Sequence, residues 1–404
     1  MLRLPFTQRG SRPLSGVATV SAEFDVAVLG AGIVGASCAW HLARRGARVV
    51  VIDASGPAAA ASGASDGAVS VASKKPGVLA RLATQSLLYT RTLAQDGPLR
   101  GHFHPRPAWY FATTEAELVA LDALIAKLDA LDGPVRSGRD GGAALLPGAG
   151  VLVRRLVEIR GEGHMTGYSA VRALLADPRI ARLWPAAVAA IEPDDKGVTL
   201  ALADGRSLRA GRVIAALGTS TPALFPGLPV RPLAGQLIIT DRGAPGALEG
   251  ALTAASYLIA KTADPSRLPE PPVVIDPLVT GQVLIGSSRV EHGDPARMDF
   301  DTILRLVRRA AAVWPALAER RVIRAFVGIR AAVADGLPIV GALPGFDRVL
   351  LATGFEGDGI CLSALMGREV AAMALGDSPA EGVERDLAAL SPARFEPAAR
   401  EVAQ

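Results

Sequence analysis

The chain has 404 residues, of which 50% are hydrophobic and 20% charged, and its net charge at pH 7 is +4. This composition excludes wholesale disorder, and the length suffices for two or three domains' worth of core. No basic block or aromatic-rich stripe occurs, so we expect no nucleic-acid partner. Two cysteines, Cys38 and Cys361, are too few for a disulfide framework, and no Cys/His cluster has zinc-ligand spacing, so we also expect no metal.

Residues 1–22 contain Arg3, Arg9 and Arg12 and no acidic residue. Targeting peptides share this bias, although the apolar run is too weak for a secretory signal. We expect a disordered N-terminal extension over residues 1–24, with a targeting peptide as the alternative. The longest apolar run, residues 26–40, is too short to span a bilayer, and we expect a cytoplasmic protein without a transmembrane segment.

A strand, a glycine turn, a helix and a second strand are predicted at the start of the ordered chain. Residues 25–29 form a short apolar run typical of a buried parallel strand. The second strand, residues 49–52, is followed by Asp53. An acid at this position is typical of the residue that binds ribose hydroxyls and argues against NADP.

Three glycines between these strands predict a dinucleotide-binding turn. Gly30 permits the tight turn, Gly32 lets the backbone approach a pyrophosphate, and Gly35 lets the helix pack close to the strand. The helix N-terminus offers free N–H groups and a positive dipole end to phosphates. Asp53 follows Gly35 by 18 residues, near the usual spacing. On this motif alone both FAD and NAD remain open.

The middle of the chain alternates predicted helices and strands. Residues 58–72 are rich in small residues, and we expect the loop at 62–68 to line the cofactor. Helices are expected at 78–95, 115–131, 168–175 and 302–314, and loops or linkers at 133–150 and 222–232. Strands are expected at 109–113, 188–192, 198–203, 212–218, 235–240, 256–260, 273–275, 282–286 and 322–327, and those after residue 234 indicate an antiparallel sheet with hairpins.

The C-terminal region contains a second strand–glycine–helix pattern. A strand at 349–354 precedes Phe355-Glu-Gly357-Asp-Gly359, and an apolar helix follows to Leu375. NAD-dependent dehydrogenases have no general need for such an element. A flavoprotein does, because reduced isoalloxazine is anionic near N1 and C2=O and a helix N-terminus stabilises that charge.

With these motifs the chain resembles the D-amino-acid oxidase-like family of FAD proteins, which includes glycine oxidase and sarcosine oxidase. The matching pieces are the N-terminal glycines with Asp53, residues 62–68, Gly328-Ile-Arg330, residues 335–341 and residues 352–359. They span nearly all of the chain after residue 24. Residues 65–77 are most similar to the FAD subunits of hydrogen cyanide synthase, opine oxidase and D-hydroxyproline dehydrogenase.

The resemblance implies that an arginine holds the substrate carboxylate. Glycine oxidase carries this arginine in a Gly-Leu/Phe-Arg-Pro motif, and here Gly328-Ile-Arg330-Ala331 keeps the arginine and loses the proline. Gly357 stands where glycine oxidase has a second substrate arginine, which weakens an assignment as glycine oxidase. Residues 331–334 are Ala-Ala-Val-Ala, so covalent flavin attachment through a cysteine there is excluded, and we expect non-covalent FAD.

Arg330 is therefore the predicted catalytic residue. Its guanidinium offers a fixed fork to a carboxylate, with two parallel N–H···O bonds. Tyr168, Tyr257, Trp109 and Phe355 are candidate pocket walls. None of the five histidines belongs to a nucleophile or metal constellation. The predicted cofactor-binding residues are Gly30, Ala31, Gly32, Ile33, Val34, Gly35, Asp53, Ala54, Ala61, Ser62, Asp66, Gly67, Ala68, Val188, Gly218, Gly354, Phe355, Glu356, Gly357, Asp358, Gly359 and Ile360.

The predicted fold class is α/β, with a Rossmann-like FAD-binding domain of the D-amino-acid oxidase type and a substrate domain with a mainly antiparallel sheet and helices. We assign residues 25–90, 150–225 and 328–385 to the FAD-binding domain. The substrate domain takes residues 91–149 and 226–327, and residues 386–404 form a C-terminal tail.

Three functions follow from this reading. The first is FAD-dependent oxidation of an amino acid or secondary amine to an imine by hydride transfer, on a glycine, sarcosine, D-amino-acid, opine or proline-derivative substrate. The second is the FAD subunit of a hetero-oligomeric dehydrogenase that passes electrons to a flavin or iron–sulfur partner. The third is a non-catalytic flavin-binding accessory protein, against which an intact Arg330 argues. A homo-oligomer is an alternative to the hetero-oligomer.

Overall fold

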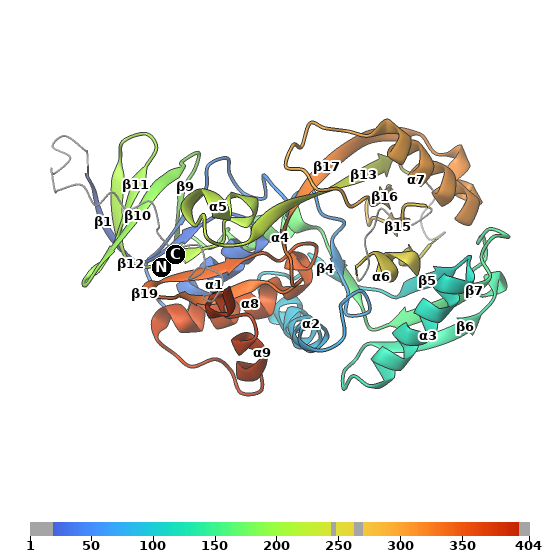
Figure 1. The fold of residues 1–404 in the computed structure, drawn as a ribbon, viewed down its shortest axis with the longest axis horizontal. Coiled ribbons are helices and arrows are strands. Elements are labelled where there is room, and N and C mark those ends of the chain that lie inside the picture. The colour runs from blue at the N-terminus through green and yellow to red at the C-terminus, as the bar shows by residue number, and fades with distance from the viewer. Residues whose placement is uncertain (1–18, 244–247, 262–269, 396–404) are drawn as a thin grey trace, which may run out of the picture.

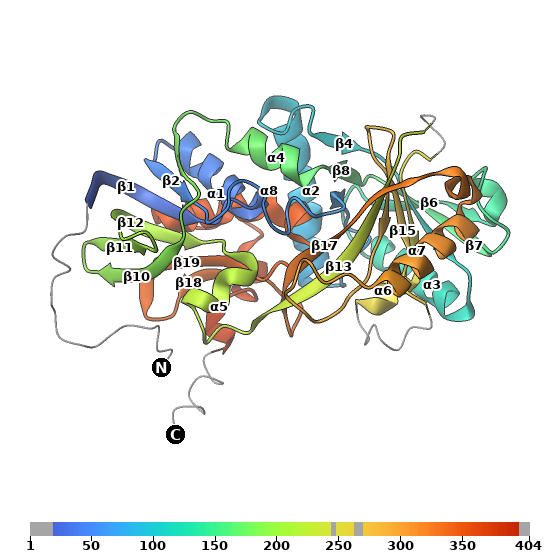
Figure 2. The ribbon, with the colours of Figure 1, turned by 90° about the horizontal axis from the view of Figure 1, so that it is seen from above.

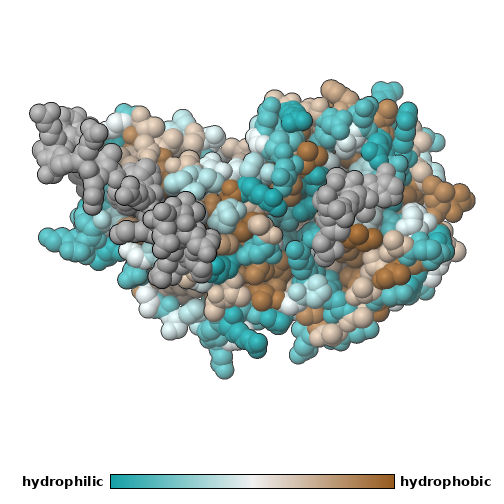
Figure 3. Space-filling view, viewed as in Figure 1, coloured by the Kyte–Doolittle hydropathy of each residue, from teal (hydrophilic) through white to brown (hydrophobic). Residues whose placement is uncertain are grey.

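The computed structural model describes residues 19–243, 248–261 and 270–395. Most of the predicted extension at 1–24 and the end of the predicted tail at 386–404 lie outside these residues. The molecule is elongated, and two eight-stranded sheets occupy its two ends (Figures 1 and 2). Hydrophilic residues spread over both ends in the space-filling view (Figure 3). No helix in the described ranges has the length and hydropathy needed to cross a bilayer.

The first sheet is built around the predicted strand–helix–strand unit. Its strand order is β10-β11-β12-β1-β2-β9, and β12 also pairs with β19, which pairs with β18. The ladders of β1 with β12 and β2, of β2 with β9, and of β12 with β19 are parallel. The strands are β1 (Thr19–Leu29), β2 (Val49–Ile52), β9 (Ile180–Leu183), β10 (Val188–Asp194), β11 (Gly197–Leu202), β12 (Ser207–Ala215), β18 (Ile339–Leu343) and β19 (Phe346–Thr353).

Apolar helices cover one face of this sheet. Helices α1 (Ile33–Arg44) and α8 (Gly359–Leu375) are buried on nearly all sides, as their runs of small apolar residues require. They pack so closely that a side chain at Gly367 would collide with Ser37. Helices α2 (Val78–Asp96) and α4 (Gly167–Leu174) contribute to the same core, while α5 (Thr221–Leu224) and α9 (Glu384–Ala388) are short.

The second sheet has the order β17-β13-β16-β15-β14-β5-β7-β6 and is antiparallel except for the β14–β5 pair. Its strands are β17 (Val322–Val333), β13 (Val230–Thr240), β16 (Val283–Gly286), β15 (Val274–Pro277), β14 (Ala251–Ala254), β5 (Ala108–Ala112), β7 (Arg155–Arg160) and β6 (Arg136–Gly141). Successive residues of β5 point to opposite faces of the sheet and so belong to different cores. Tyr110 packs in the cluster that includes α3 (Glu115–Asp129), and Phe111 packs in the cluster that includes α7 (Phe300–Val313).

A small third sheet, β3-β8-β4, contributes Ala68 and His164 to the central region. Its strands are β3 (Ala68–Val69), β8 (Gly163–Met165) and β4 (Phe103–Pro105). The whole arrangement confirms the predicted α/β class with a second, mainly antiparallel sheet. The predicted division into domains stays a prediction.

The long β13–β17 ribbon connects the two ends of the molecule (Figure 1). Its pairing runs from Val230 opposite Val333 to Thr240 opposite Val322. Val230 and Val333 lie in the apolar cluster of the first sheet, and Ile238 lies in that of the second. The ribbon thus places the residues near its middle at the junction of the two halves.

Several sequence-based assignments were wrong in detail. Residues 256–260, expected as a strand, form helix α6 (Ser256–Ala260), because a short apolar run has no periodicity that separates a strand from a buried helical turn. The expected loop at 133–150 contains the edge strand β6, whose sequence is polar because an edge strand is solvated. The expected linker at 222–232 includes α5 and the start of β13.

The first strand begins at Thr19, six residues before the expected start at Asp25, because it continues along its long neighbour β12. Strands β7 and β17 extend over residues that no apolar pattern marked as strand, and they are held by their cross-strand partners. The length of these two strands depends on their register with the neighbouring strands, which the apolar pattern of a sequence does not reveal.

His41 generates a prediction about stability. Burial lowers its pKa from 6.5 to about 4, against the opposing hydrogen bond of Nδ1 with the Ser37 carbonyl at 2.7 Å. The folded protein therefore keeps His41 neutral, and its contribution to stability is complete above pH 6.5 and is lost as the pH falls through about 4. Between pH 7 and pH 5 the loss should be about 2 kcal/mol.

Urea unfolding of the wild type and His41→Gln at both pH values measures this contribution. The free energy of unfolding should fall less steeply with acidification in the variant. Equal pH dependence in the two proteins would show that His41 does not titrate on unfolding.

Candidate cofactor and substrate site

A cavity of about 430 Å³ lies where the parallel strands of the first sheet end. It is bounded by the turn after β1, the end of β2, the segment after β12 and the turn after β19. This crevice outside the carboxyl ends of parallel strands is where open α/β sheets bind ligands. Predicted cofactor residues that line it are Gly30, Gly32, Ile33, Val34, Asp53, Ala54, Ala61, Ser62, Val188, Gly218, Gly354, Phe355, Glu356 and Gly359.

The turn after β1 needs its glycines for two different reasons. Gly30 has a φ of +106°, and a side chain there would collide with the Ala216 carbonyl oxygen. A side chain at Gly35 would collide with the carbonyl oxygen of Gly30. Gly32 is less crowded, since an added Cβ would meet only Ser62 Oγ, at 3.3 Å, on the side of the cavity.

The first turn of α1 faces this cavity and carries no acidic residue. Its amide at Ile33 donates to Ser62 Oγ at 2.9 Å, which ties the 62–68 loop to the helix. Asp53 Oδ2 accepts from Ala31 N at 2.8 Å, and Oδ1 accepts from Ser55 N and Gly56 N. The carboxylate is therefore fixed at the cavity wall by three amides.

A second, smaller cavity of about 70 Å³ adjoins the first and shares Ile33, Ser62 and Glu356 with it. Arg330 of β17 lines it, together with the predicted residues Asp66, Gly357 and Ile360. Tyr257, a candidate pocket wall, also lines it. The two motifs that the sequence separates by almost 300 residues, the first glycine turn and Arg330, thus border connected space.

The Arg330 guanidinium is held by neutral oxygens. Nη2 donates to Ser287 Oγ at 3.1 Å, and Nη1 donates to the Ser288 carbonyl at 3.3 Å. Gly235 on β13 makes room for it, because a side chain there would run into the guanidinium. Within the part of the chain that the structure describes, Arg330 takes part in no ion pair.

Other predicted residues lie apart from these cavities. Ala31 and Gly35 stand behind the first turn, and Gly67 packs against His164, so none of them lines either cavity. Ala68 lines a third cavity, of about 50 Å³, together with Asp66. Among the candidate pocket walls, Phe355 lines the first cavity; Trp109 lies in the core of the second sheet and Tyr168 is exposed.

Asp358, predicted as a cofactor residue, lines neither of the first two cavities. It belongs instead to a buried charge cluster with Lys74 and Lys261 beside the start of α8, and this cluster was not predicted from the sequence. Asp358 Oδ1 accepts from Lys74 Nζ and from Lys261 Nζ, each at 3.0 Å, and all three side chains are less than a tenth exposed. Burial alone raises the pKa of Asp358, but the two ammonium groups outweigh it and hold the pKa below its ordinary value. The sequence signal that could have drawn attention to this cluster was the scarcity of lysine, since the chain has only five lysines.

Two further buried pairs were also missed. Arg289 donates to Glu356 Oε1 at 2.7 Å, and Arg106 donates to the fully buried Asp276. Asp276 ends the apolar run 273–275, and an acid in such a run is a signal that a charge is buried. The thiols of Cys38 and Cys361 are buried, and burial raises their pKa to about 12 and about 11.

Comparison with known proteins adds the family. The model of the DAO family, described as FAD dependent oxidoreductase, matches residues 25–373. A subunit of the opine oxidase of Rhizobium meliloti is 28% identical over 78% of this chain and 84% of its own length. A bifunctional protein of tRNA 5-methylaminomethyl-2-thiouridine biosynthesis from Maricaulis maris is 30% identical over 92% of this chain, which spans 55% of that relative.

Among solved structures, glycine oxidase from Geobacillus kaustophilus superposes with a TM-score of 0.80 at 24% identity. The match covers 91% of this chain and 98% of the other. At this identity the likeness concerns the fold.

The buried charge cluster generates a stability prediction. Asp358→Asn should destabilise the protein by about 3–5 kcal/mol, because it leaves two buried ammonium groups without their counter-charge. Thermal and urea unfolding measure the loss. Asp347→Asn, at an exposed position, is the control and should stay near the wild type. An Asp358→Asn variant as stable as this control would show that the lysines do not depend on Asp358.

Proposed function

We propose that this chain, which belongs to the DAO family of FAD-dependent oxidoreductases, oxidises the amine of an amino acid or of a related secondary amine to an imine. The observation that carries the proposal is Arg330. Its guanidinium lies in a small cavity joined to the large one and is bound only to the neutral oxygens of Ser287 and Ser288 within the described residues. Glu356 attracts Arg330 but is itself paired with Arg289, so an incoming carboxylate would supply the direct ion-pair partner that Arg330 lacks among the described residues.

The first cavity fits a long dinucleotide. We assign the pyrophosphate to the backbone at Gly32 and to the N-terminal turn of α1, which has no acidic residue and whose Ile33 amide is held by Ser62 Oγ. Asp53 is assigned to the ribose hydroxyls, and the turn at 354–359 before α8 to the far end of the cofactor. FAD, when bound, accepts the hydride and so supplies the redox chemistry. The cofactor is proposed to be non-covalent, since neither cysteine lines a described cavity.

Arg330 binds and orients the substrate in this proposal. A carboxylate on its two terminal nitrogens would fix the adjacent carbon relative to the junction of the cavities. The reaction removes a hydride from that carbon and a proton from the nitrogen, and water then hydrolyses the imine. Burial of the surrounding walls, including Gly235 and Leu237 of β13, keeps bulk water from the charge pair.

A second candidate is the same half-reaction in the FAD subunit of a hetero-oligomeric dehydrogenase. It is supported by the name of one relative, which is a subunit of an opine oxidase. The two candidates differ in the electron acceptor.

One experiment tests both. The purified flavoprotein is mixed anaerobically with glycine, sarcosine, proline derivatives and opines, and bleaching of the flavin is followed. Oxygen is then added. Bleaching followed by rapid reoxidation supports an oxidase, bleaching with slow reoxidation supports a dehydrogenase subunit, and no bleaching by any amine favours a non-catalytic accessory role.

Gly32→Val tests the cofactor site. The added side chain should abolish FAD binding, because it stands where the backbone meets the pyrophosphate. The fold should persist, since Ser62 Oγ is the only close neighbour of an added Cβ. Flavin absorbance per folded protein, measured after acid release of the cofactor, gives the result. Gly142→Val, at an open position, is the matched control. Normal FAD content in Gly32→Val would refute the assigned role.

Arg330→Ala tests the substrate clamp. We expect a loss of about 2–5 kcal/mol in kcat/KM, with unchanged FAD content, because the carboxylate loses its buried partner. Arg330→Lys should restore only part of the lost kcat/KM, since an ammonium does not reproduce the paired N–H donors of the guanidinium. Arg324→Ala, on the exposed part of the same strand, is the control. If Arg330→Ala processes the acid as well as the control does, Arg330 is not the anchor.

A further inference from the structure

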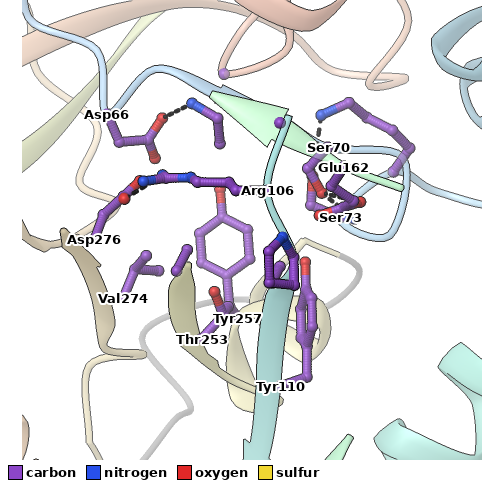
Figure 4. Close-up of a pocket in the computed structure, with 17 residues that line it drawn as sticks. Asp66, Ser70, Ser73, Arg106, Tyr110, Glu162, Thr253, Tyr257, Val274 and Asp276 are labelled. Atoms are coloured by element: carbon purple, nitrogen blue, oxygen red, sulfur yellow. Dashed lines mark hydrogen bonds and ion pairs between the residues drawn. The ribbon is translucent and has the colours of Figure 1, made fainter. Parts of the chain in front are cut away.

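The third cavity, of about 50 Å³, lies beyond the Arg330 pocket and is lined by charged groups (Figure 4). It shares Asp66, Tyr257 and Gly357 with that pocket, so the two spaces are contiguous. In the close-up, Arg106 and Asp276 meet on one side of the cavity and the Tyr257 ring projects between them and Thr253. A volume of this size holds a small polar group.

One carboxylate oxygen in this cavity has no partner. Asp276 is fully buried; its Oδ1 accepts from Arg106 Nη2, but its Oδ2 has no hydrogen-bond partner among the described residues. Arg106 Nη1 is occupied by the Pro277 carbonyl at 2.6 Å. A buried carboxylate oxygen without a donor is costly, which marks the position where a donor group is missing.

The charge around this oxygen is negative. Asp66 and Asp276 both line the cavity, and the charges that act on Asp276 are those of Arg106 and Asp66. Glu162 also lines the cavity, but Lys74 and Lys127 both attract its charge. Beside the orphaned oxygen two carboxylates therefore face one guanidinium, which favours a cation as the missing donor. In the described ranges no three His, Cys, Asp or Glu side chains could together hold a metal, which favours an organic cation.

The shared lining of the two cavities allows one ligand to reach both groups. Asp66, Tyr257 and Gly357 line both cavities, so Arg330 and Asp276 border contiguous space. Asp276 is on β15, and Ser288, whose carbonyl accepts from Arg330, follows the end of the neighbouring strand β16. An amino acid whose side chain ends in a cation, such as lysine, carries the two charges that these groups require.

We propose that the cavity at Asp276 binds the cationic end of a basic amino-acid substrate whose carboxylate lies on Arg330. The inference deepens the proposed amine oxidation and rests on it for the position of the carboxylate. Burial raises the pKa of Asp276 to about 7, against the attraction of Arg106, and a bound cation would favour the ionised form.

The test compares matched ligands that differ only in the distal charge. Lysine is paired with norleucine and arginine with citrulline, each as both enantiomers. Binding to the oxidised holoprotein is measured by calorimetry and by perturbation of the flavin spectrum, and anaerobic flavin reduction is measured separately. We expect at least one basic ligand to bind about 30-fold or more tightly than its neutral partner.

Asp276→Asn keeps an oxygen for Arg106 and removes the charge. In this variant the basic and neutral members of each pair should bind within about threefold of one another. Asp294→Asn, an exposed surface change, should retain the wild-type preference. Circular dichroism and flavin content show whether each variant is folded, and the wild-type comparison stands even if Asp276→Asn does not fold.

The outcomes separate this inference from the proposed function. Equal wild-type binding of basic and neutral partners would overturn the inference, whether or not neutral amino acids bleach the flavin. A preference for the basic ligand that survives in folded Asp276→Asn would also overturn it. Tight, Asp276-dependent binding of a basic ligand without any flavin reduction would uphold the cation site and refute amine oxidation.

Discussion

The antiparallel pairing of β13 with β17 is the interaction on which the rest of the structure depends. At one end of this ribbon Val230 and Val333 are buried in the core of the first sheet, and at the other Ile238 is buried in the core of the second. The register of the ribbon places Arg330 at the junction, opposite Leu233. A one-residue slip would turn every side chain to the opposite face, so the position of the guanidinium is set by the same apolar contacts that join the two halves.

Charges are buried around this junction because the cavities meet there. Asp358 is shared by Lys74 and Lys261, and Glu356 is paired with Arg289. Such pairs add little net stability, since desolvation of the ions offsets much of their attraction. Their effect is to fix the conformation of the turn before α8, because any shift of this turn would leave a buried charge without its partner. The turn that borders the cofactor cavity is therefore held by electrostatic requirement as well as by packing.

Much of the fold and part of the site could be predicted from the sequence, and the reason for each limit is physical. The first glycine turn is local, so Gly30 and Gly35 could be read from spacing alone. Helix α6 could not be distinguished from a strand, because five residues are too few to show a period. The pairings of Lys74 with Asp358 and of Arg106 with Asp276 join residues far apart in the chain, and only the tertiary fold brings them together.

The distribution of partners separates structural charges from those available to a ligand. Arg289 and Arg106 each have a carboxylate partner, whereas Arg330 is bound to neutral oxygens in the described chain. On the acidic side, Asp276 has one oxygen satisfied and one without a donor. The two incomplete groups have opposite charge and face contiguous cavities, and a single ligand with a carboxylate at one end and a cation at the other would complete both. Two separate ligands would each have to lose their hydration and freedom independently, so one molecule that spans both positions is the more favourable occupant.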